Sequence, residues 1–312
     1  MLSRKSKTEI LPRVLVILGP TASGKTKLAV ALAAKFKGEI ISADSRQVFK
    51  GMDIGTGKDL SEYKIGRQNI PYHLIDVVKP TEDFDLAKFQ VLAFKAIAKV
   101  LKKGKLPILV GGSGLYLQAV VDNYDLGRAG SDREARTRRE KLAAEELLAD
   151  IERLNPAFAK KINESDRHNA RRLARYLEIV EQGRVSDLKK AVPYEFKLIG
   201  LNPGREVLRE KIEKRLRERL EKEGLVEEVK KLHKQGVSWQ RLESFGLEYK
   251  FIAHYLQKKI EYEKMVIDLN IAIRQFAKRQ LTWFKRWEKQ GKSIKWFKDA
   301  AKAEKALERG II

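Results

Sequence analysis

The chain has 312 residues, which is enough for one large domain and a smaller one, and it contains no cysteine, so disulfides, thiolate catalysis and zinc fingers are excluded. Its 65 Lys and Arg residues against 42 Asp and Glu give a formal net charge of +23, which favours a polyanionic partner, nucleic acid before a membrane; a generally lysine-rich proteome is the alternative explanation. No apolar run reaches 18 residues and residues 1–13 are polar and basic, so we expect a cytoplasmic protein with no membrane contact.

The first predicted elements surround a glycine-rich loop. An apolar strand over residues 14–18 runs into Gly-Pro-Thr-Ala-Ser-Gly-Lys-Thr, and the residues that follow carry apolar side chains at helical spacing. Strand, loop and helix in this order predict a phosphate-binding loop, whose N–H groups converge on a phosphate at the positive end of the helix. Lys25 would reach a terminal phosphate, and the Thr26 hydroxyl would bind a phosphate-bound Mg²⁺. The loop consists of Gly19, Pro20, Thr21, Ala22, Ser23, Gly24, Lys25 and Thr26.

Predicted strands alternate with helices up to residue 121. We expect a strand over 39–44, a loop over 45–58, a strand over 72–78, a helix over 84–101, a strand over 106–110 and a tight turn at 111–114. This alternation predicts the α/β class, with a parallel sheet flanked by helices as in P-loop NTPases. Asp44 and Ser113 follow two of the strands, so we expect both in the crevice at the carboxyl edge of the sheet. Asp44 could hold Mg²⁺ through water, act as a general base, or cap the following turn.

The second half of the chain is mainly helical. A charged, strand-poor stretch predicts an inserted all-helical subdomain over 122–193, which leaves 1–121 and 194–312 as the core domain. A strand over 196–201 returns to the sheet and precedes one long helix over 205–235. Next to its apolar stripe stands Arg215, which spacing alone directs into solvent. A last helical region starts near residue 262, and its candidate buried residues are Ile267, Ile271, Phe276 and Leu281.

Basic residues gather near the end of the chain. Nine Lys and Arg residues between 274 and 299 are interleaved with six aromatic residues, a pattern that suits phosphates and unstacked bases of a nucleic acid, although some of these rings must be core. A second basic cluster, within 133–139 and 167–175, is nearly balanced by acidic residues. The four histidines lack metal-ligand spacing. Unless Asp76 serves, no apolar run ends in an aspartate placed like that of a Walker B element, which weakens an ATPase interpretation.

Five motifs together resemble bacterial tRNA dimethylallyltransferases over essentially the whole chain. They are Gly-Pro-Thr-Ala-Ser-Gly-Lys-Thr at 19–26, Ser-Ala-Asp-Ser-Arg-Gln-Val-Phe-Lys-Gly-Met-Asp-Ile-Gly-Thr-Gly-Lys at 42–58, Pro-Tyr-His-Leu-Ile-Asp at 71–76, Gly-Gly-Ser-Gly-Leu-Tyr at 111–116 and Lys-Arg-Gln-Leu-Thr-Trp-Phe at 278–284. The resemblance implies transfer of a dimethylallyl group from its diphosphate to N6 of adenosine 37, next to the anticodon, in tRNAs that read codons beginning with U. The glycine-rich loop would then hold a diphosphate and would not hydrolyse ATP.

The resemblance also assigns roles to residues. Asp44 would take the proton from the adenine amine, while Lys25, Thr26, Ser113 and Arg215 would hold the departing diphosphate with Mg²⁺. This assignment replaces the solvent position of Arg215. The tRNA anticodon arm would contact Asp44, Ser45, Arg46, Gln47, Arg136, Arg171, Arg172, Arg175, Phe245, Gly246, Lys278, Arg279, Gln280, Trp283 and Lys285. We expect the protein to act as a monomer.

This sequence departs from the family pattern in three places. Ser113 stands where the family often has Thr, Tyr72 where it has His, and Gly246-Leu247-Glu248-Tyr249 where it has Gly-Tyr followed by Arg or Lys. The last change bears on the tRNA contacts expected from 243–248. The alternatives are an adenylate isopentenyltransferase that uses free AMP, a P-loop small-molecule kinase whose lid is the insertion at 128–175, and an RNA-binding module with an inert phosphate loop.

Overall fold

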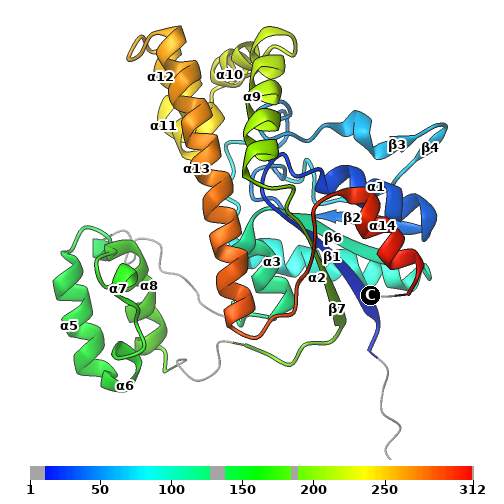
Figure 1. Ribbon diagram of the computed structural model, residues 1–312. Helices are drawn as coiled ribbons and strands as arrows, with labels where there is room; N and C mark the ends of the chain where they lie inside the picture. Colours follow the sequence, from blue (N-terminus) through cyan, green and yellow to red (C-terminus); the bar gives the residue numbers. More distant parts are fainter. Residues whose placement is uncertain (1–10, 127–137, 184–188, 311–312) are drawn as a thin grey trace, which may run out of the picture. The chain divides into compact units, whose positions relative to one another are not determined.

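A computed structural model describes residues 11–126, 138–183 and 189–310 (Figure 1). The chain divides into two compact units, one formed by Met1–Val121 with Val192–Ile312 and the other by Asp122–Ala191. The second unit lies within the stretch 122–193 expected for the insertion and ends two residues earlier. Among the residues that the structure describes, no helix is both long enough and apolar enough to cross a membrane.

The first unit is built on a six-stranded parallel sheet. Its strands, in spatial order, are β5 (Tyr72–His73), β2 (Gly38–Ser42), β6 (Leu106–Gly111), β1 (Arg13–Leu18), β7 (Glu195–Leu201) and β8 (Lys295–Phe297). The helices on its faces are α1 (Lys25–Lys35), α2 (Leu86–Lys102), α3 (Gly114–Val121) and α14 (Ala300–Glu308). A short helix, η1 (Leu60–Tyr63), and a two-stranded antiparallel ribbon, β3 (Lys64–Ile65) with β4 (Gln68–Asn69), lie outside this sheet. The expected α/β class is confirmed.

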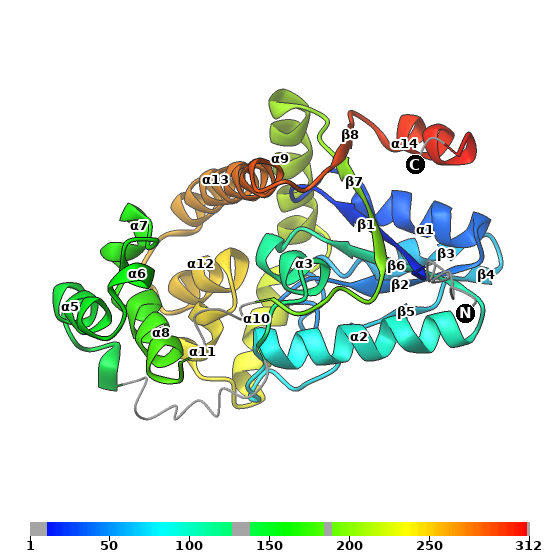
Figure 2. The same ribbon diagram turned by 90° about the horizontal axis from the view of Figure 1, so that it is seen from below.

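Alternating side chains of β1 explain the two layers of helices. Val14, Val16 and Leu18 belong to an apolar cluster with α2 and α3, whereas Leu15 and Ile17 belong to a second cluster with α1 and α14. All five side chains are buried, as expected for a central strand covered on both faces. Figure 2 shows α1 and α14 on one side of the sheet and α2 and α3 on the other.

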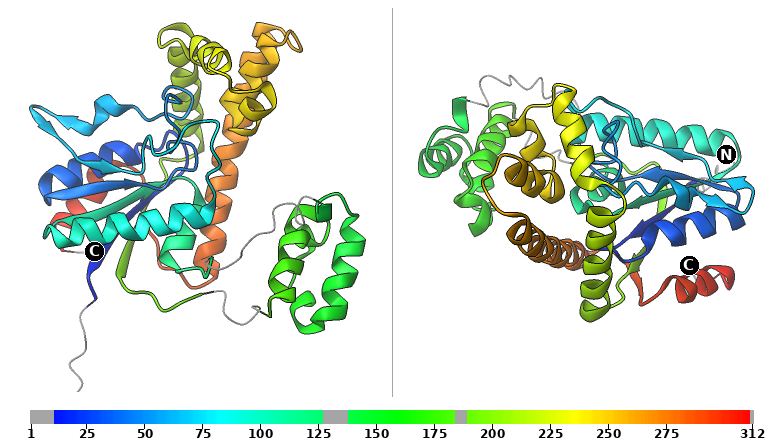
Figure 3. Two further views of the ribbon diagram at one scale, coloured as in Figure 1. Left: turned by 180° about the vertical axis from the view of Figure 1, so that it is seen from behind. Right: turned by 90° about the horizontal axis from the view of Figure 1, so that it is seen from above.

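A group of helices stands over the carboxyl edge of the sheet. It contains α9 (Arg205–Glu221), α10 (Leu225–Lys234), α11 (Trp239–Ser244), α12 (Leu247–Leu256) and α13 (Tyr262–Lys289). Apolar residues of α9 and α13 pack against each other, and α10 to α12 form another cluster with residues 48–52 of the long loop after β2. Figure 3 shows α9 and α13 rising together from the sheet with the shorter helices near their ends. These helices therefore form walls above the strand ends.

The predicted strand over 72–78 is wrong beyond His73. Leu74 and Asp76 have φ values of 64° and 56°, in the left-handed region, and this backbone cannot continue a strand. The segment turns to the long loop instead, where Asp76 N donates to Gln47 O at 3.1 Å. The Asp76 carboxylate pairs with the buried ammonium of Lys58. Tertiary contacts with the long loop therefore accompany the end of the strand at His73.

Two helical predictions also need correction. The expected helix over 205–235 is two helices, because Gly224, with φ 78°, separates α9 from α10. In α13, Ile267, Ile271 and Phe276 were expected to be buried but are 60%, 40% and 39% exposed. The buried face of α13 consists of Met265, Leu269, Ile273, Ala277, Gln280, Phe284 and Trp287. Leu281, the fourth expected core residue, is partly buried beside the cluster of α9 and α13.

The second unit has an apolar core of its own. It contains α5 (Ala144–Leu154), α6 (Pro156–Ala159), α7 (Glu164–Arg167) and α8 (Ala170–Glu181), and the core residues all come from 147–180. Asn155, Asn163 and Asn169 cap three of these helices with their side-chain oxygens, which satisfies N–H groups that the first helical turn leaves unpaired. The described part of this unit is therefore helical, as expected.

Candidate active site

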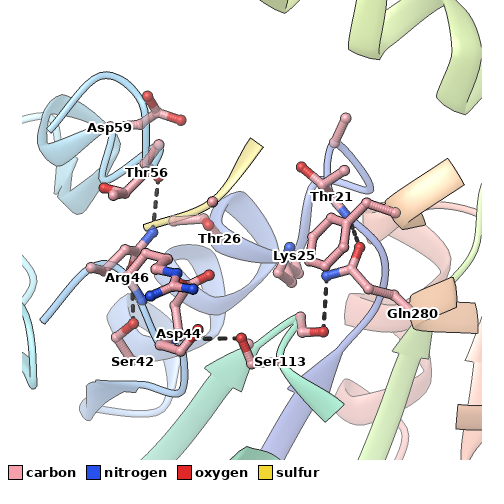
Figure 4. Close-up of a pocket in the computed structure, with 18 of the residues that line it drawn as sticks. Thr21, Lys25, Thr26, Ser42, Asp44, Arg46, Thr56, Asp59, Ser113 and Gln280 are labelled. Atoms are coloured by element: carbon pink, nitrogen blue, oxygen red, sulfur yellow. Dashed lines mark hydrogen bonds between the residues drawn. The ribbon is translucent and has the colours of Figure 1, made fainter. Parts of the chain in front are cut away.

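A pocket of about 730 Å³ opens at the carboxyl edge of the parallel sheet (Figure 4). Its floor is formed by the segments that follow β1, β2 and β6, and its walls come from η1, α9, α12 and α13. All of its lining residues belong to the first unit. They include Thr21, Lys25, Thr26, Asp44, Ser45, Arg46, Gln47, Ser113, Tyr116, Arg215, Arg219, Gly246, Glu248, Phe276, Gln280 and Trp283. The strand ends thus bring together the glycine-rich loop, Asp44 and Ser113, as the topology predicts.

The glycine-rich loop has the geometry of a phosphate cradle. Gly24 has φ 89°, and α1 begins at the next residue, so the N-terminus of this helix opens into the pocket. The ammonium of Lys25 donates to Pro20 O at 3.2 Å across the loop. Burial, followed by the charge of Arg215, lowers the pKa of Lys25 to about 8. An anion bound in the loop would stabilise the protonated form of Lys25, because a nearby negative charge favours the ammonium.

Two arginines of α9 lie at the pocket. Arg215 donates a hydrogen bond to the Thr21 hydroxyl, so the solvent position suggested by spacing is wrong. Burial, and then the charge of Arg219, lowers the pKa of Arg215 to about 10. Arg219 is 3% exposed and donates to Asp59 Oδ1 at 3.3 Å. Cations from α1 and α9 therefore converge on the loop, an arrangement that stabilises a bound anion.

Asp44 lies two residues beyond β2 and faces the same pocket. Its Oδ1 accepts a hydrogen bond from Arg46 N at 2.8 Å, so the carboxylate does cap the turn, one of the three possibilities drawn from the sequence. The cap occupies one oxygen of a carboxylate that has two, and it therefore does not exclude proton transfer. The Ser113 hydroxyl accepts from Ser45 N at 3.4 Å, which ties the turn after β6 to the Asp44 segment.

Comparisons with known proteins decide the family. The family model described as IPP transferase matches residues 47–287. A tRNA dimethylallyltransferase 1 from Syntrophus aciditrophicus is 45% identical over 92% of this chain and 94% of its own length, and a tRNA dimethylallyltransferase 2 from Citrifermentans bemidjiense is 46% identical over 92% and 91%. The chain belongs to the IPP transferase family.

Solved structures of IPP transferases share the fold. The tRNA isopentenylpyrophosphate transferase of Bacillus halodurans superposes with a TM-score of 0.64 at 37% identity, covering 92% of this chain and 90% of that one. A eukaryotic dimethylallyltransferase acting on tRNA gives a TM-score of 0.70 at 26% identity, covering 87% and 69%.

In this IPP transferase, α13 carries the residues expected to contact tRNA near the chain end. Lys278, Arg279 and Lys285 are exposed, and Arg279 also lines the pocket. Trp283 lines the pocket too, and the Arg286 guanidinium stacks on its ring at 4.4 Å. Gln280, by contrast, is 7% exposed and bonds to backbone groups of the protein.

The aromatic residues of the C-terminal region divide into three groups. Phe276 and Trp283 line the pocket, whereas Phe284 and Trp287 are buried in the core beneath the sheet-facing side of α13. Trp296 and Phe297 belong to β8, where they pair with Gly200 and Leu201 of β7. Only the first group lines the pocket, and the expectation that some of these rings belong to the core is confirmed.

The segment around 245 holds two of the expected tRNA contacts. The Phe245 side chain is 1% exposed, packs on Phe49 at 4.8 Å between ring centroids and contributes to the pocket lining. Gly246 lies at the pocket next to Arg46, so two of the expected contact segments do meet. Arg241 covers the Phe245 ring at 4.8 Å and closes this cluster from outside.

Three expected tRNA contacts belong to α8 in the second unit. Arg171 is 82% exposed in its side chain and lies 3.4 Å from Glu140, and Arg175 pairs with Glu178 at 2.7 Å. Arg172 forms an ion pair with the buried carboxylate of Asp166. Each arginine thus has an acidic partner, in line with the near balance of charge in the sequence. Arg136 lies outside the described residues.

Thr26 remains the candidate metal ligand. It lines the pocket directly after Lys25, and within the described ranges no three His, Asp or Glu side chains gather as a metal site. Mg²⁺ often binds through substrate phosphates and water with only one or two protein ligands. A single hydroxyl beside a phosphate cradle fits this mode.

Arg219 is a charged residue of the pocket that the sequence predictions did not assign to the site. Arg219 follows Arg215 by four residues, on the same side of α9, so a pair at this spacing beside the apolar stripe was the available signal. Glu248, in the segment 243–248 expected to contact tRNA, also lines the pocket, and burial raises the pKa of its carboxyl group. Its carboxyl group therefore belongs to the pocket wall.

Proposed function

We propose that this IPP transferase moves the dimethylallyl group of dimethylallyl diphosphate to N6 of adenosine 37 in tRNAs that read codons beginning with U. The observation that carries the proposal is one pocket lined by Lys25, Arg215 and Asp44, with Arg215 hydrogen-bonded to Thr21 of the glycine-rich loop. The cations suit a diphosphate, and the carboxylate suits an amine that must lose a proton.

In the proposed reaction, the adenine N6 forms a bond to C1 of the dimethylallyl group while the bond from C1 to the diphosphate oxygen breaks. The electron pair leaves with the diphosphate, whose oxygens gain negative charge, and the N6 proton passes to Asp44. The loop N–H groups, Lys25 and Arg215 stabilise this charge, and the Ser113 hydroxyl can donate a hydrogen bond to the diphosphate. Preorganised donors of this kind stabilise the transition state more than the substrate.

A Mg²⁺ ion is expected to enter with the diphosphate. Thr26 would hold it, and the ion would neutralise part of the charge on the leaving group. The site residues fit this role because the loop supplies one hydroxyl and the diphosphate supplies the remaining charged ligands.

The adenine must leave the stack of the anticodon loop to reach this pocket. Tyr116, Phe276 and Trp283 line it, and aromatic side chains are common partners of unstacked bases. We further propose that the anticodon arm binds the exposed cations of α13 and those of the inserted unit. We also propose that the enzyme acts as a monomer in the cytoplasm.

One incubation tests the proposal. Purified protein, Mg²⁺, dimethylallyl diphosphate and an unmodified tRNA transcript should yield isopentenyl adenosine by nucleoside mass analysis, and a transcript with guanosine at position 37 should yield none. Lys25→Ala should lose the product at least 10²-fold, whereas Lys35→Ala, at an exposed lysine in the last turn of α1 and outside the pocket lining, should not. Absence of product from the wild-type protein refutes the proposal.

The alternatives give different results in parallel reactions. An adenylate isopentenyltransferase would modify AMP at a rate comparable with tRNA, and a small-molecule kinase would consume ATP and ignore the isoprenyl diphosphate. An RNA-binding module with an inert loop would bind tRNA and lose nothing on Lys25→Ala.

A further inference from the structure

One buried side chain connects the two loops that form the floor of the pocket. Gln280, on the inner face of α13, accepts a hydrogen bond from Thr21 N at 2.8 Å and donates its Nε2–H to Gly112 O at 2.9 Å (Figure 4). One partner is a backbone donor and the other a backbone acceptor. Only an amide of this length offers both an acceptor and a donor at its tip, so the pair of contacts selects glutamine.

The packing around this contact leaves little freedom. A Cβ at Gly112 would lie 2.5 Å from the Gln280 amide nitrogen, and one at Gly114 would lie 2.3 Å from the Trp283 ring. The turn that carries Ser113 is thus pressed against α13 on both sides of the serine. The same Thr21 that donates to Gln280 also receives the hydrogen bond from Arg215 through its hydroxyl. Thr21 is therefore held from two helices, α9 and α13.

We propose that Gln280 is a positioning residue for the departing diphosphate. It fixes the phosphate-binding loop to the Gly-Gly-Ser-Gly turn, so that the loop N–H groups and the Ser113 hydroxyl keep one spacing before the substrate arrives. Preorganisation of this kind removes an ordering cost from binding and from the chemical step. The proposal rests on the proposed function, and it replaces the tRNA contact that the family resemblance assigned to Gln280.

The test uses inorganic diphosphate with Mg²⁺ as the probe, measured by titration calorimetry on the full chain. Gln280→Met keeps the length of the side chain and removes both hydrogen bonds. We expect it to weaken diphosphate binding about tenfold, as two neutral hydrogen bonds of ordinary strength allow, and to change the affinity for tRNA less than twofold. In turnover, the KM for dimethylallyl diphosphate should rise while the KM for tRNA stays constant.

Gln90→Met is the matched control. Gln90 is also 7% exposed, and its Nε2–H donates to Ala119 O at 2.8 Å between α2 and α3, away from the phosphate loop. It should lose comparable thermal stability with no change in diphosphate affinity. If Gln280→Met does not fold, Gln280→Asn keeps an amide too short to reach both partners, and Gln90→Asn becomes its control.

The outcomes separate this inference from the function itself. Weaker tRNA binding with normal diphosphate binding would show that Gln280 contacts tRNA, and equal losses in the Gln280 and Gln90 variants would show a general effect of stability. Either result overturns the positioning role. If Lys25→Ala also leaves diphosphate binding unchanged, the pocket does not hold a diphosphate and the proposed function fails with it.

Discussion

Lys25 should make diphosphate binding depend on pH in a defined range. Its pKa of about 8 without a ligand means that about 90% of the chains carry the ammonium at pH 7 and about 10% at pH 9. A bound diphosphate favours the charged form and raises the pKa, so by linkage the affinity falls as pH rises through 8. If the neutral amine contributes little, the part of the affinity due to Lys25 should decrease about tenfold between pH 7 and pH 9.

The assay compares the wild-type protein with Lys25→Gln, which does not titrate, by calorimetry with inorganic diphosphate and Mg²⁺ between pH 6 and pH 9.5. The ratio of the two affinities cancels the ionisation of the ligand. We expect a constant ratio up to pH 7 and a decline centred near pH 8. Lys35→Gln, at a side chain 42% exposed in the last turn of α1 and outside the pocket lining, should follow the wild-type curve. A ratio that stays flat to pH 9.5 would refute the lowered pKa and the contact of Lys25 with the ligand.

Three further predictions concern the base, the tRNA surface and the sheet. Asp44→Ala should slow single-turnover chemistry by roughly 10² to 10⁴-fold with little change in tRNA affinity, and a normal chemical rate would leave Asp44 only its turn cap. Neutralising three exposed cations of α13 should lower the slope of log affinity for tRNA against log salt concentration by about 2, since each phosphate contact contributes roughly 0.7 to 0.9. A control triple variant on α2 should leave the slope unchanged. Equal effects of the two triple variants would indicate that the net charge acts as a diffuse field. The test residues are Lys278, Arg279 and Lys285, and the controls are the exposed Lys95, Lys99 and Lys102. Burial alone would raise the pKa of Glu39, but hydrogen bonds from Lys103, Lys105 and His73 lower this pKa from 4.5 to about 2. The Glu39 carboxylate therefore stabilises the fold above pH 4.5. This contribution to the free energy of unfolding, up to about 3 kcal/mol, is lost as pH falls toward 2. Urea denaturation should therefore show a smaller stability difference between wild type and Glu39→Gln at pH 2.5 than at pH 7, and a constant difference would contradict the lowered pKa.

The sequence predicted the elements whose order follows from local pattern. The glycine-rich loop, the strands on either side of it and the turn at Ser113 were found because strand, turn and helix signals adjoin there. Parallel topology then requires the strand ends to meet, which is why Asp44 and Ser113 were expected beside Lys25 before any contact was known.

Tertiary contacts decided the features that the sequence did not reveal. The apolar stripe of α9 does not indicate which side of the helix faces the pocket, so spacing alone predicted a solvent position for Arg215. The aromatic residues of α13 alternate between core and pocket, and composition cannot separate Phe284 from Trp283. Gln280 sits in a basic motif that suggests tRNA contact, yet its partners, Thr21 and Gly112, are remote in the chain.

The place of β7 in the sheet has a consequence for synthesis of the protein. Strand β1 pairs on one side with β6 and on the other with β7, whose residues leave the ribosome only after the whole inserted unit. Until then one long edge of β1 presents unpaired backbone groups, which is the state most open to association with another chain. The inserted unit draws its core from 147–180 and can fold during this interval. A pause in translation after β1 and β6 have left the ribosome, but before β7 has, should therefore raise aggregation of the nascent chain more than a pause after residue 201 has left it.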